Sequence, residues 1–251
     1  MFSIIIPTFN AGEKIKTTLQ SIAGQTWLDH ETIIIDNCST DNTLDIINGF
    51  RDLTHCSIQV FSSPDKGIYD AQNKGIDKAK YPWILFLGAG DRLHHNDVLA
   101  TVAKKTEMNA DIIYGNILKY SERIPDFFST QYPPERISKV RLLRSRGICQ
   151  QSMIIKKNVF KSVRLSDKYQ VAGDFDWILT CVEQKIVFGY IGEMITEYSI
   201  DGLSGSNLIH LHSELKSVIR NHYPRPVSFL FSIFLDVSHL KYKLKKIFHN
   251  E

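Results

Sequence analysis

Residues 2–10 read FSIIIPTFN, in which a continuous β-branched run at 4–6 is closed by Pro7. An apolar run without alternation is typical of a strand that is buried on both faces, as in a parallel sheet covered by helices. The opening of the chain therefore predicts a strand that is buried on both faces of such a sheet. Similar short apolar runs follow at residues 32–35, 58–61 and 83–87.

Stretches with helical spacing separate these runs. Ile15, Leu19 and Ile22 recur on one helical face, and Thr40 is placed to cap a second helix. This alternation predicts right-handed βαβ units, and hence an α/β fold with a mostly parallel, Rossmann-like sheet flanked by helices. The apolar positions of this second helix include Leu44, Ile47 and Phe50. Further expected elements are a helix over 68–79, a strand over 111–114 and a long loop over 121–136.

Length and composition fit a folded α/β protein. The 251 residues, 43% hydrophobic and 23% charged with a net charge of +3, suit one large domain over residues 1–223 and a tail over 224–251. This mild charge does not predict nucleic-acid binding. The four cysteines form no CxxC pair, so neither a zinc site nor a disulfide framework is expected.

The chain shows neither a signal-peptide pattern at its start nor an apolar run long enough to span a bilayer. We therefore expect a cytoplasmic protein, or one at the cytosolic face of the inner membrane.

In parallel sheets, ligands bind beyond the carboxyl ends of the strands. Four segments lie at such ends here, at residues 7–10, 36–40, 64–67 and 88–91, and all are rich in small, polar or acidic residues. The acidic residue in the second segment, Asp36, has two compatible interpretations: it contacts a nucleobase or ribose, or it builds the turn before the next helix.

The fourth segment, Gly88-Ala89-Gly90-Asp91, combines close backbone approach with a carboxylate. Hard divalent cations prefer oxygen ligands, and a diphosphate can complete their coordination. The simpler alternative is a turn in which Asp91 caps a helix.

Two carboxylates at 174 and 176 stand at the start of an expected helix. At this spacing they point in different directions, so they are expected to do different work. One can act as a general base, and the other can cap the helix.

Together these motifs resemble the family 2 glycosyltransferases, an inverting group with the GT-A fold. The segments SIIIPTFN, IDNCSTDNT, SPDKGIYDAQNKGI, FLGAGDRL and AGDFDW occur in the family's order across the first 200 residues or so. Among its members, the chain is most similar to the bacterial subgroup that builds exopolysaccharide, capsule or O-antigen.

The resemblance implies a role for each matching residue. Asp174 matches the catalytic base, Asp91 the ligand of a Mn²⁺ or Mg²⁺ cofactor, and Asp36 the carboxylate that contacts the base of a uridine or similar nucleotide. The other positions that match the nucleotide-sugar donor pocket are Pro7, Thr8, Asn10, Lys66, Gly67, Asp70 and Gly90.

Three positions depart from the family's pattern. Gly90 stands where many relatives have an acid, and Gln72 where many have an arginine near the diphosphate, for which Lys66 or Lys74 is a candidate replacement. Gln150 stands where the subgroup often has a histidine.

The implied activity is transfer of a sugar from a nucleotide-diphosphate sugar, UDP-linked by preference, with inversion. The enzyme would be of the hexosyl- or N-acetylhexosaminyltransferase type. The acceptor would be a glycan or a polyprenyl-linked saccharide in surface polysaccharide biosynthesis. Two alternatives rank lower: a non-catalytic nucleotide-sugar-binding or scaffold protein, and a sugar nucleotidyltransferase, whose glycine-rich triphosphate loop is not found at residues 7–12.

The tail is predicted to be a basic amphipathic helix. Its apolar face permits three interpretations: peripheral contact with an anionic membrane, packing on the domain, or dimerisation. The face comprises Leu230, Ile233, Phe234, Val237, Leu240, Leu244 and Ile247, and the basic residues are Lys241, Lys243, Lys245 and Lys246.

Overall fold

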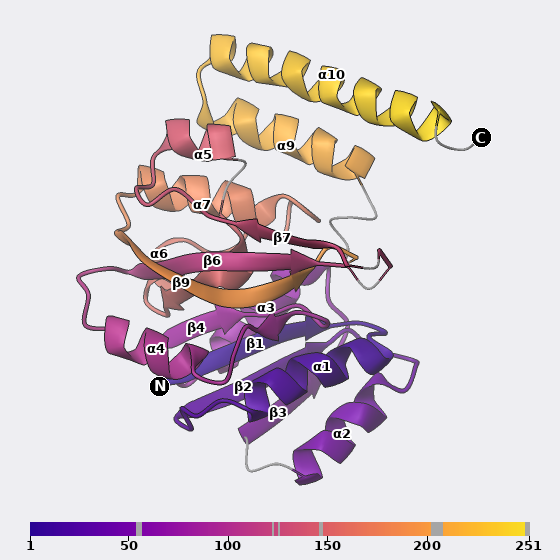
Figure 1. The fold of residues 1–251 in the computed structure, drawn as a ribbon. Helices are drawn as coiled ribbons and strands as arrows, with labels where there is room; N and C mark the ends of the chain where they lie inside the picture. The colour runs from indigo at the N-terminus through magenta and orange to yellow at the C-terminus, as the bar shows by residue number, and fades with distance from the viewer. Residues whose placement is uncertain (54–56, 122, 125, 146–147, 202–207, 249–251) are drawn as a thin grey trace.

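A computed structural model describes residues 1–53, 57–121, 123–124, 126–145, 148–201 and 208–248, and the side chains of the last helix as far as Val237 (Figure 1). The first half of the chain forms parallel strands in the order β3-β2-β1-β4. This confirms the predicted α/β class, and the first strand lies between two parallel neighbours. The bounds are β1 (Phe2–Thr8), β2 (His30–Asp36), β3 (Ser57–Ser62) and β4 (Trp83–Phe86).

Beyond β4 the sheet continues with mixed strand directions. β8 (Met153–Lys156) pairs antiparallel with β4, and β6 (Ile112–Tyr120) pairs antiparallel with β8. β9 (Phe188–Ser199) runs parallel to β6, and the short β5 (Arg92–Leu93) closes this edge.

A further strand lies inside the segment that the sequence predicts to be a loop. β7 (Phe128–Gln131) pairs antiparallel with β6. Its residues are exposed or half-buried, with Phe128 63% exposed, so the strand carries no apolar run that would reveal it. The prediction of an irregular segment over 121–136 was wrong at these four residues.

Helices cover both faces of the sheet because successive β1 side chains point to opposite faces. Ile4 and Ile6 pack in one apolar cluster and Ile5 in the other, all fully buried. Burying a side chain of this size contributes about 1.5–3 kcal/mol. The first face carries α1 (Gly12–Ala23), α2 (Thr43–Leu53) and α4 (Val98–Lys105), and the second carries α3 (Ile68–Lys78), α5 (Lys139–Ser145), α6 (Val159–Ser162) and α7 (Gly173–Glu183).

The cap of α2 differs from the prediction. The carboxylate of Asp41 accepts hydrogen bonds from the backbone N–H and the hydroxyl of Thr43, at 3.1 and 2.5 Å. The backbone N–H of Thr40 instead donates to the side chain of Asn10, at 2.9 Å. Thr40 therefore links two loops and is not the cap.

Two long helices extend the second face. α9 (Leu208–His222) packs on α7, and α10 (Arg225–Phe248) packs on α9, as the stack in Figure 1 shows. Within the described residues, no helix is both long and apolar enough to cross a membrane.

The face of α10 that the sequence singles out does not pack on the domain where its side chains are described. Leu230, Ile233, Phe234 and Val237 are 66%, 46%, 50% and 47% exposed. The helix is attached through a different set, with Ser228 and Leu235 buried. The later positions of the predicted face and the four lysines lie outside the described side chains.

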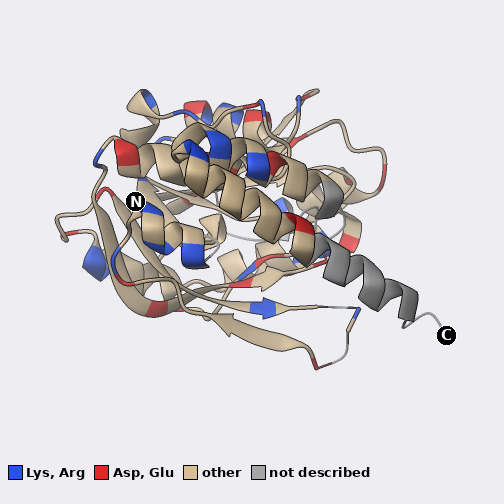
Figure 2. Cartoon of the chain, turned by 90° about the horizontal axis from the view of Figure 1, so that it is seen from above, with Lys and Arg blue, Asp and Glu red and all other residues tan. Residues whose placement is uncertain are grey.

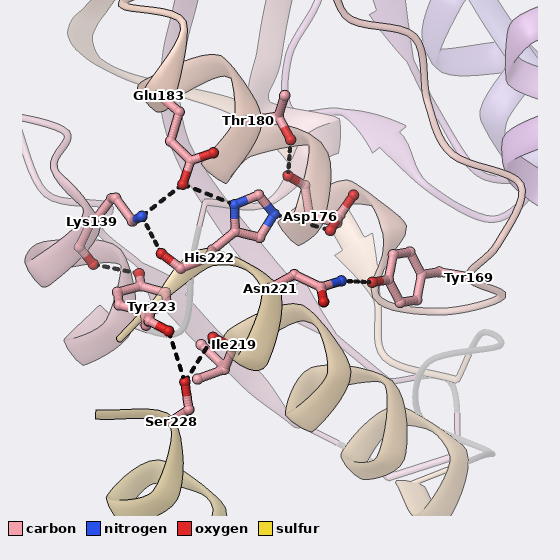
Figure 3. Close-up of polar contacts among 10 residues, drawn as sticks. All are labelled: Lys139, Tyr169, Asp176, Thr180, Glu183, Ile219, Asn221, His222, Tyr223 and Ser228. Atoms are coloured by element: carbon pink, nitrogen blue, oxygen red, sulfur yellow. Dashed lines mark hydrogen bonds and ion pairs between the residues drawn. The ribbon is translucent and has the colours of Figure 1, made fainter. Parts of the chain in front are cut away.

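A polar cluster joins the end of α9 to α7 and α5 (Figure 3). The imidazole of His222 lies 3.0 Å from Asp176 Oδ1 and 3.1 Å from Glu183 Oε1. Lys139 Nζ lies 2.6 Å from the same Glu183 oxygen. Hydrogen bonding to Asp176 and Glu183 raises the pKa of His222 above its ordinary value of 6.5.

This pKa shift predicts a pH-dependent contribution to stability. Because the folded-state pKa of His222 is raised, its contribution is fully present below about pH 6.5 and is lost as the pH rises through the folded pKa. We expect His222→Gln to lower the melting temperature at pH 6 by about 2–8 °C, for a loss of about 1–2 kcal/mol. Thermal unfolding of the wild type and the variant at several pH values tests this. A difference between their melting temperatures that does not become smaller towards pH 9 would contradict the prediction.

Candidate active site

A cavity of about 890 Å³ opens at the carboxyl ends of the parallel strands. All four predicted loops contribute to it, which places the site where the sequence analysis expects ligands to bind. The residues that these loops contribute to the cavity lining are Pro7, Thr8, Phe9, Asn10, Asn37, Asp65, Gly67, Gly88, Ala89 and Asp91.

Hydrogen bonds between side chains and backbone fix these loops to one another. Asn10 is in the left-handed conformation with φ 45°. Its side-chain oxygen accepts from the Thr40 backbone N–H, and its own backbone N–H donates to the Ser39 hydroxyl, both at 2.9 Å. Asn37 Oδ1 accepts from the Asp65 backbone N–H at 2.9 Å. The first three loops therefore form one braced edge.

Asp36 lies beneath this edge and does not line the cavity. Its side chain is fully buried, with Oδ1 accepting from the Ser39 hydroxyl at 2.5 Å and Oδ2 from the Ser62 hydroxyl at 2.6 Å. These contacts match the turn-building interpretation. The neighbouring Asn37 is the residue of this loop that reaches the cavity.

The lysines predicted near the donor pocket point elsewhere. Lys66 Nζ lies 3.8 Å from Asp167, and Lys74 Nζ lies 2.9 Å from Asp70, so Lys66, Lys74 and Asp70 all lie outside the cavity lining. The cations that do line the cavity are Lys14, Lys119 and Arg123, which the motifs did not reveal.

Asp91 is buried at the edge of the cavity. Its Oδ2 accepts from the Gly88 backbone N–H at 2.8 Å, and its Oδ1 from the Ser199 backbone N–H at 3.1 Å. Burial raises the pKa of Asp91 to about 7. An added side chain at Gly88 would come within 2.8 Å of Asp91 Oδ2, so the glycine permits this contact.

Asp91 fits a divalent cation only as part of a shared site. Across the described residues, no three His, Cys, Asp or Glu side chains are grouped to hold a metal ion. Each Asp91 oxygen accepts one backbone hydrogen bond, and the Gln151 side chain also hydrogen bonds to this carboxylate. A diphosphate in the cavity would bring further oxygen ligands to a shared cation.

Gly90 supports this loop without lining the cavity. Its φ of 109° is one that other residues rarely adopt. Its N–H donates to the Thr18 hydroxyl at 2.9 Å, and its carbonyl accepts from the Tyr120 hydroxyl.

Asp174 and Asp176 separate as their spacing predicts. Asp174, in the first turn of α7, lines the cavity, whereas Asp176 pairs with His222 and makes no helix cap. Burial of Asp174 away from bulk water raises its pKa to about 6. The Phe175 backbone N–H, which donates to Oδ1 at 2.8 Å, has the opposite effect and lowers this pKa.

Two of the departures from the family's pattern contact each other. Gln72 and Gln150 form a reciprocal amide pair, with Gln72 Nε2 2.8 Å from Gln150 Oε1 and the return bond at 3.2 Å. Both side chains are buried, 2% and 4% exposed. This neutral pair occupies the positions where the resemblance places an arginine and a histidine.

The far end of the cavity is apolar. It is built by the segment around η1 (Gln150–Ser152) and by α5, α7, α9 and α10. Sequence motifs gave no sign of this half, because its side chains come from helices whose docking is not readable from spacing. The residues are Leu143, Ile148, Phe175, Leu211, Leu215, Phe231 and Leu235.

A helix-covered sheet whose strand-end loops share a cavity with a buried carboxylate is a GT-A-like α/β architecture. The chain belongs to glycosyltransferase family 2: the family model described as "Glycosyl transferase family 2" matches residues 3–164. The PGL/p-HBAD biosynthesis glycosyltransferase of Mycobacterium tuberculosis is 35% identical over 213 residues, covering 82% of this chain and 80% of that protein. Asp174, α9 and α10 lie beyond the matched family region.

Solved structures show the same fold. Staphylococcus aureus TarS 1–349 in complex with UDP-GlcNAc has a TM-score of 0.66 at 16% identity, covering 94% of this chain and 69% of that one. This chain spans only 38% of the longer TarS chain. The mannosyltransferase PcManGT from Pyrobaculum calidifontis, in complex with GDP-Man and Mn²⁺, has a TM-score of 0.67 at 14% identity, covering 94% and 68%.

The glutamine pair predicts non-additive stability. We expect Gln72→Met or Gln150→Met alone to cost about 1–3 kcal/mol, because each leaves one buried amide without its partner. The double variant should cost less than the sum of the two, because no unpaired amide remains. Chemical unfolding of the three variants measures this coupling, and strictly additive losses would contradict it.

Proposed function

We propose that the chain transfers a sugar, with inversion, from a nucleotide-diphosphate sugar to a glycan or lipid-linked saccharide acceptor. The observation that carries this proposal is one cavity that joins the strand-end loops to the half-buried carboxylate of Asp174. The loops suit a donor, and the carboxylate suits an acceptor hydroxyl.

Asp174 acts as the general base. Inversion requires the acceptor oxygen to attack the anomeric carbon from the side opposite the departing nucleoside diphosphate. The carboxylate takes the hydroxyl proton as the bond forms. A pKa of about 6 leaves Asp174 ionised at neutral pH while keeping its proton affinity close to the working range.

The leaving diphosphate gains negative charge as the bond breaks. Lys14, Lys119 and Arg123 line the cavity and offset this charge. A Mn²⁺ or Mg²⁺ ion held by Asp91 and the diphosphate would supply further Lewis-acid stabilisation.

In this proposal the donor is a UDP-sugar, and the transferred sugar is a hexose or an N-acetylhexosamine. The fold shared with TarS, solved in complex with UDP-GlcNAc, supports UDP, although the GDP-Man complex of PcManGT shows that the fold accommodates another base. Asn37, Asp65 and Gly67 line the donor end and are candidates to bind the nucleotide, with Pro7, Thr8 and Asn10 beside them. Asp36, Lys66, Asp70 and Gly90 act by shaping this edge.

The acceptor is membrane-bound in this proposal, and the pathway is bacterial surface glycan assembly of the exopolysaccharide, capsule or O-antigen kind. Residues 226–235 of α10 carry no charge, and the described part of the helix is largely tan in Figure 2. The exposed Leu230, Ile233 and Phe234 suit peripheral insertion at the cytosolic membrane face. On the inner side of the same helix, Phe231 and Leu235 line the cavity.

Asp174→Asn is the direct test of the base. It preserves shape but removes the proton acceptor, so we expect UDP release from UDP-sugars to fall by about 10²–10⁴-fold. Donor affinity, measured by calorimetry, should stay within a few-fold. Asp176→Asn, whose side chain pairs with His222, is the matched control and should retain most activity. Near-normal turnover by Asp174→Asn would refute the assignment of Asp174 as the general base.

The cation is tested at Asp91. We expect chelation by EDTA to suppress turnover, Mn²⁺ to restore it, and Asp91→Asn to need more Mn²⁺ for half-maximal activity, because an amide is a weaker ligand than a carboxylate. Metal titrations of the wild type and the variant measure this. Full activity of the wild type in EDTA would contradict a cation requirement.

The membrane contact is tested on the exposed face of α10. Each buried large apolar side chain contributes about 1.5–3 kcal/mol, so Ile233→Asp with Phe234→Asp should weaken binding to anionic liposomes by about tenfold or more. Leu28→Asp alters a side chain that is 81% exposed in the loop before β2 and serves as the control. Equal co-sedimentation of the two variants with liposomes would refute this role of α10.

A further inference from the structure

The segment that leads into Asp174 is held in an unusual way. Residues 170–173 present four successive backbone N–H groups, and every one donates to a side chain from a distant helix. Backbone groups in loops are more often satisfied by water or by neighbouring backbone. Here the two side chains that accept these hydrogen bonds are Glu214 and Tyr69.

Glu214, on α9, accepts three of the four. Its Oε1 lies 2.7 Å from the Gln170 nitrogen, and its Oε2 lies 2.8 Å from both the Val171 and the Ala172 nitrogens. The side chain is only 11% exposed. Hydrogen bonds to an ionised acceptor are stronger than neutral ones, so this carboxylate fixes the segment firmly.

Tyr69, on α3, holds the fourth. Its hydroxyl accepts from the Gly173 N–H at 2.9 Å and donates to the Val171 carbonyl at 2.8 Å. A side chain added at Gly173 would approach the Tyr69 ring to 2.6 Å, so the glycine lets the ring pack directly on this backbone. Tyr69 also lines the cavity, directly after the donor-side loop that contains Gly67.

We propose that Glu214 and Tyr69 are positioning residues that clamp segment 170–173 from opposite helices and thereby aim the Asp174 carboxylate at the acceptor hydroxyl. This inference rests on the proposed function of Asp174 as the base. It gives α9 a role in the reaction although α9 lies outside the region that matches the family model.

Glu214 also acts on Asp174 through its charge. This negative charge raises the pKa of Asp174, in the same direction as the larger effect of burial. The other titratable groups nearby are the Cys149 thiol, whose pKa the charge of Asp174 helps to raise, and His210, 3.5 Å from Glu214.

The test combines Glu214→Gln and Tyr69→Phe, with Lys216→Gln as the control. Glutamine keeps the shape of Glu214 but loses the charge and one acceptor oxygen, and phenylalanine keeps the ring of Tyr69 without its hydroxyl. Lys216, also on α9, pairs with Asp236 of α10 and does not touch segment 170–173. The titration of Asp174 is followed by carboxyl ¹³C NMR, with Asp174→Asn identifying its signal.

We expect the Asp174 midpoint to move to lower pH in Glu214→Gln, because a nearby negative charge is removed, and not to move in Lys216→Gln. In UDP release from UDP-glucose, UDP-galactose or UDP-GlcNAc, kcat should fall by about 10–100-fold in Glu214→Gln and Tyr69→Phe, because a base displaced by about 1 Å loses rate on that scale. KM for the donor should change by less than about threefold.

An unchanged Asp174 midpoint in folded Glu214→Gln would overturn the inference, as would kcat values within twofold of the wild type in the two variants. If Glu214→Gln does not fold, the kcat of Tyr69→Phe decides alone. A wild-type protein that releases no UDP from any of these sugars refutes the proposed function instead, and the NMR titration then still decides whether the clamp controls Asp174.

Discussion

Burial of β1 on both faces is the constraint from which the rest of the structure follows. With Ile4 and Ile6 packed on one side and Ile5 on the other, the strand is stable only between two layers of helices. Each crossover helix returns the chain to the same end of the sheet. The carboxyl ends of the first four strands therefore lie at one edge of the sheet. The polar segments that follow these strands are not covered by the helix layers there and can face a ligand.

The two halves of the cavity have different origins. The half formed by the strand-end loops is local, since each of its loops directly follows a strand and is braced by its neighbours, as Asn10 and Asn37 illustrate. The half around Asp174 is built by residues that are far apart in the sequence, because side chains of α3 and α9 both hydrogen bond to the segment before Asp174. The proposed general base, Asp174, thus depends on helices that come late in the chain as well as on the sheet.

Much of the fold could be predicted from the sequence. Short apolar runs located the parallel strands, and the strand-end rule located the cavity. The prediction missed β7, because an exposed edge strand has no apolar pattern, and it assigned the α2 cap to Thr40 when Asp41 makes that bond. Motif matching could name Asp174, but no pattern pointed to Glu214, since its partners are backbone N–H groups that carry no sequence signal.

The α10 helix shows that an amphipathic pattern does not identify what the apolar face of a helix packs against. The pattern predicted one apolar face, of which Leu230, Ile233, Phe234 and Val237 are described and exposed. It could not say whether the domain covers this face, because the docking angle depends on side chains elsewhere. In the structure, Ser228 and Leu235 face inward and Ile233 and Phe234 face outward. The helix therefore has two apolar surfaces, one that completes the cavity and one that is free along its described part.

The central claim is that the strand-end cavity binds a nucleotide-diphosphate sugar. The most direct measurement is thermal unfolding with UDP, GDP, TDP and their sugars, each with and without Mn²⁺. A ligand specific for the folded state at 100 times its dissociation constant adds about 2.7 kcal/mol of stability, a readily measured shift. The account predicts stabilisation by one nucleotide class, UDP by preference, and its loss on removal of the diphosphate. No stabilisation by any of these nucleotides at millimolar concentration would contradict it.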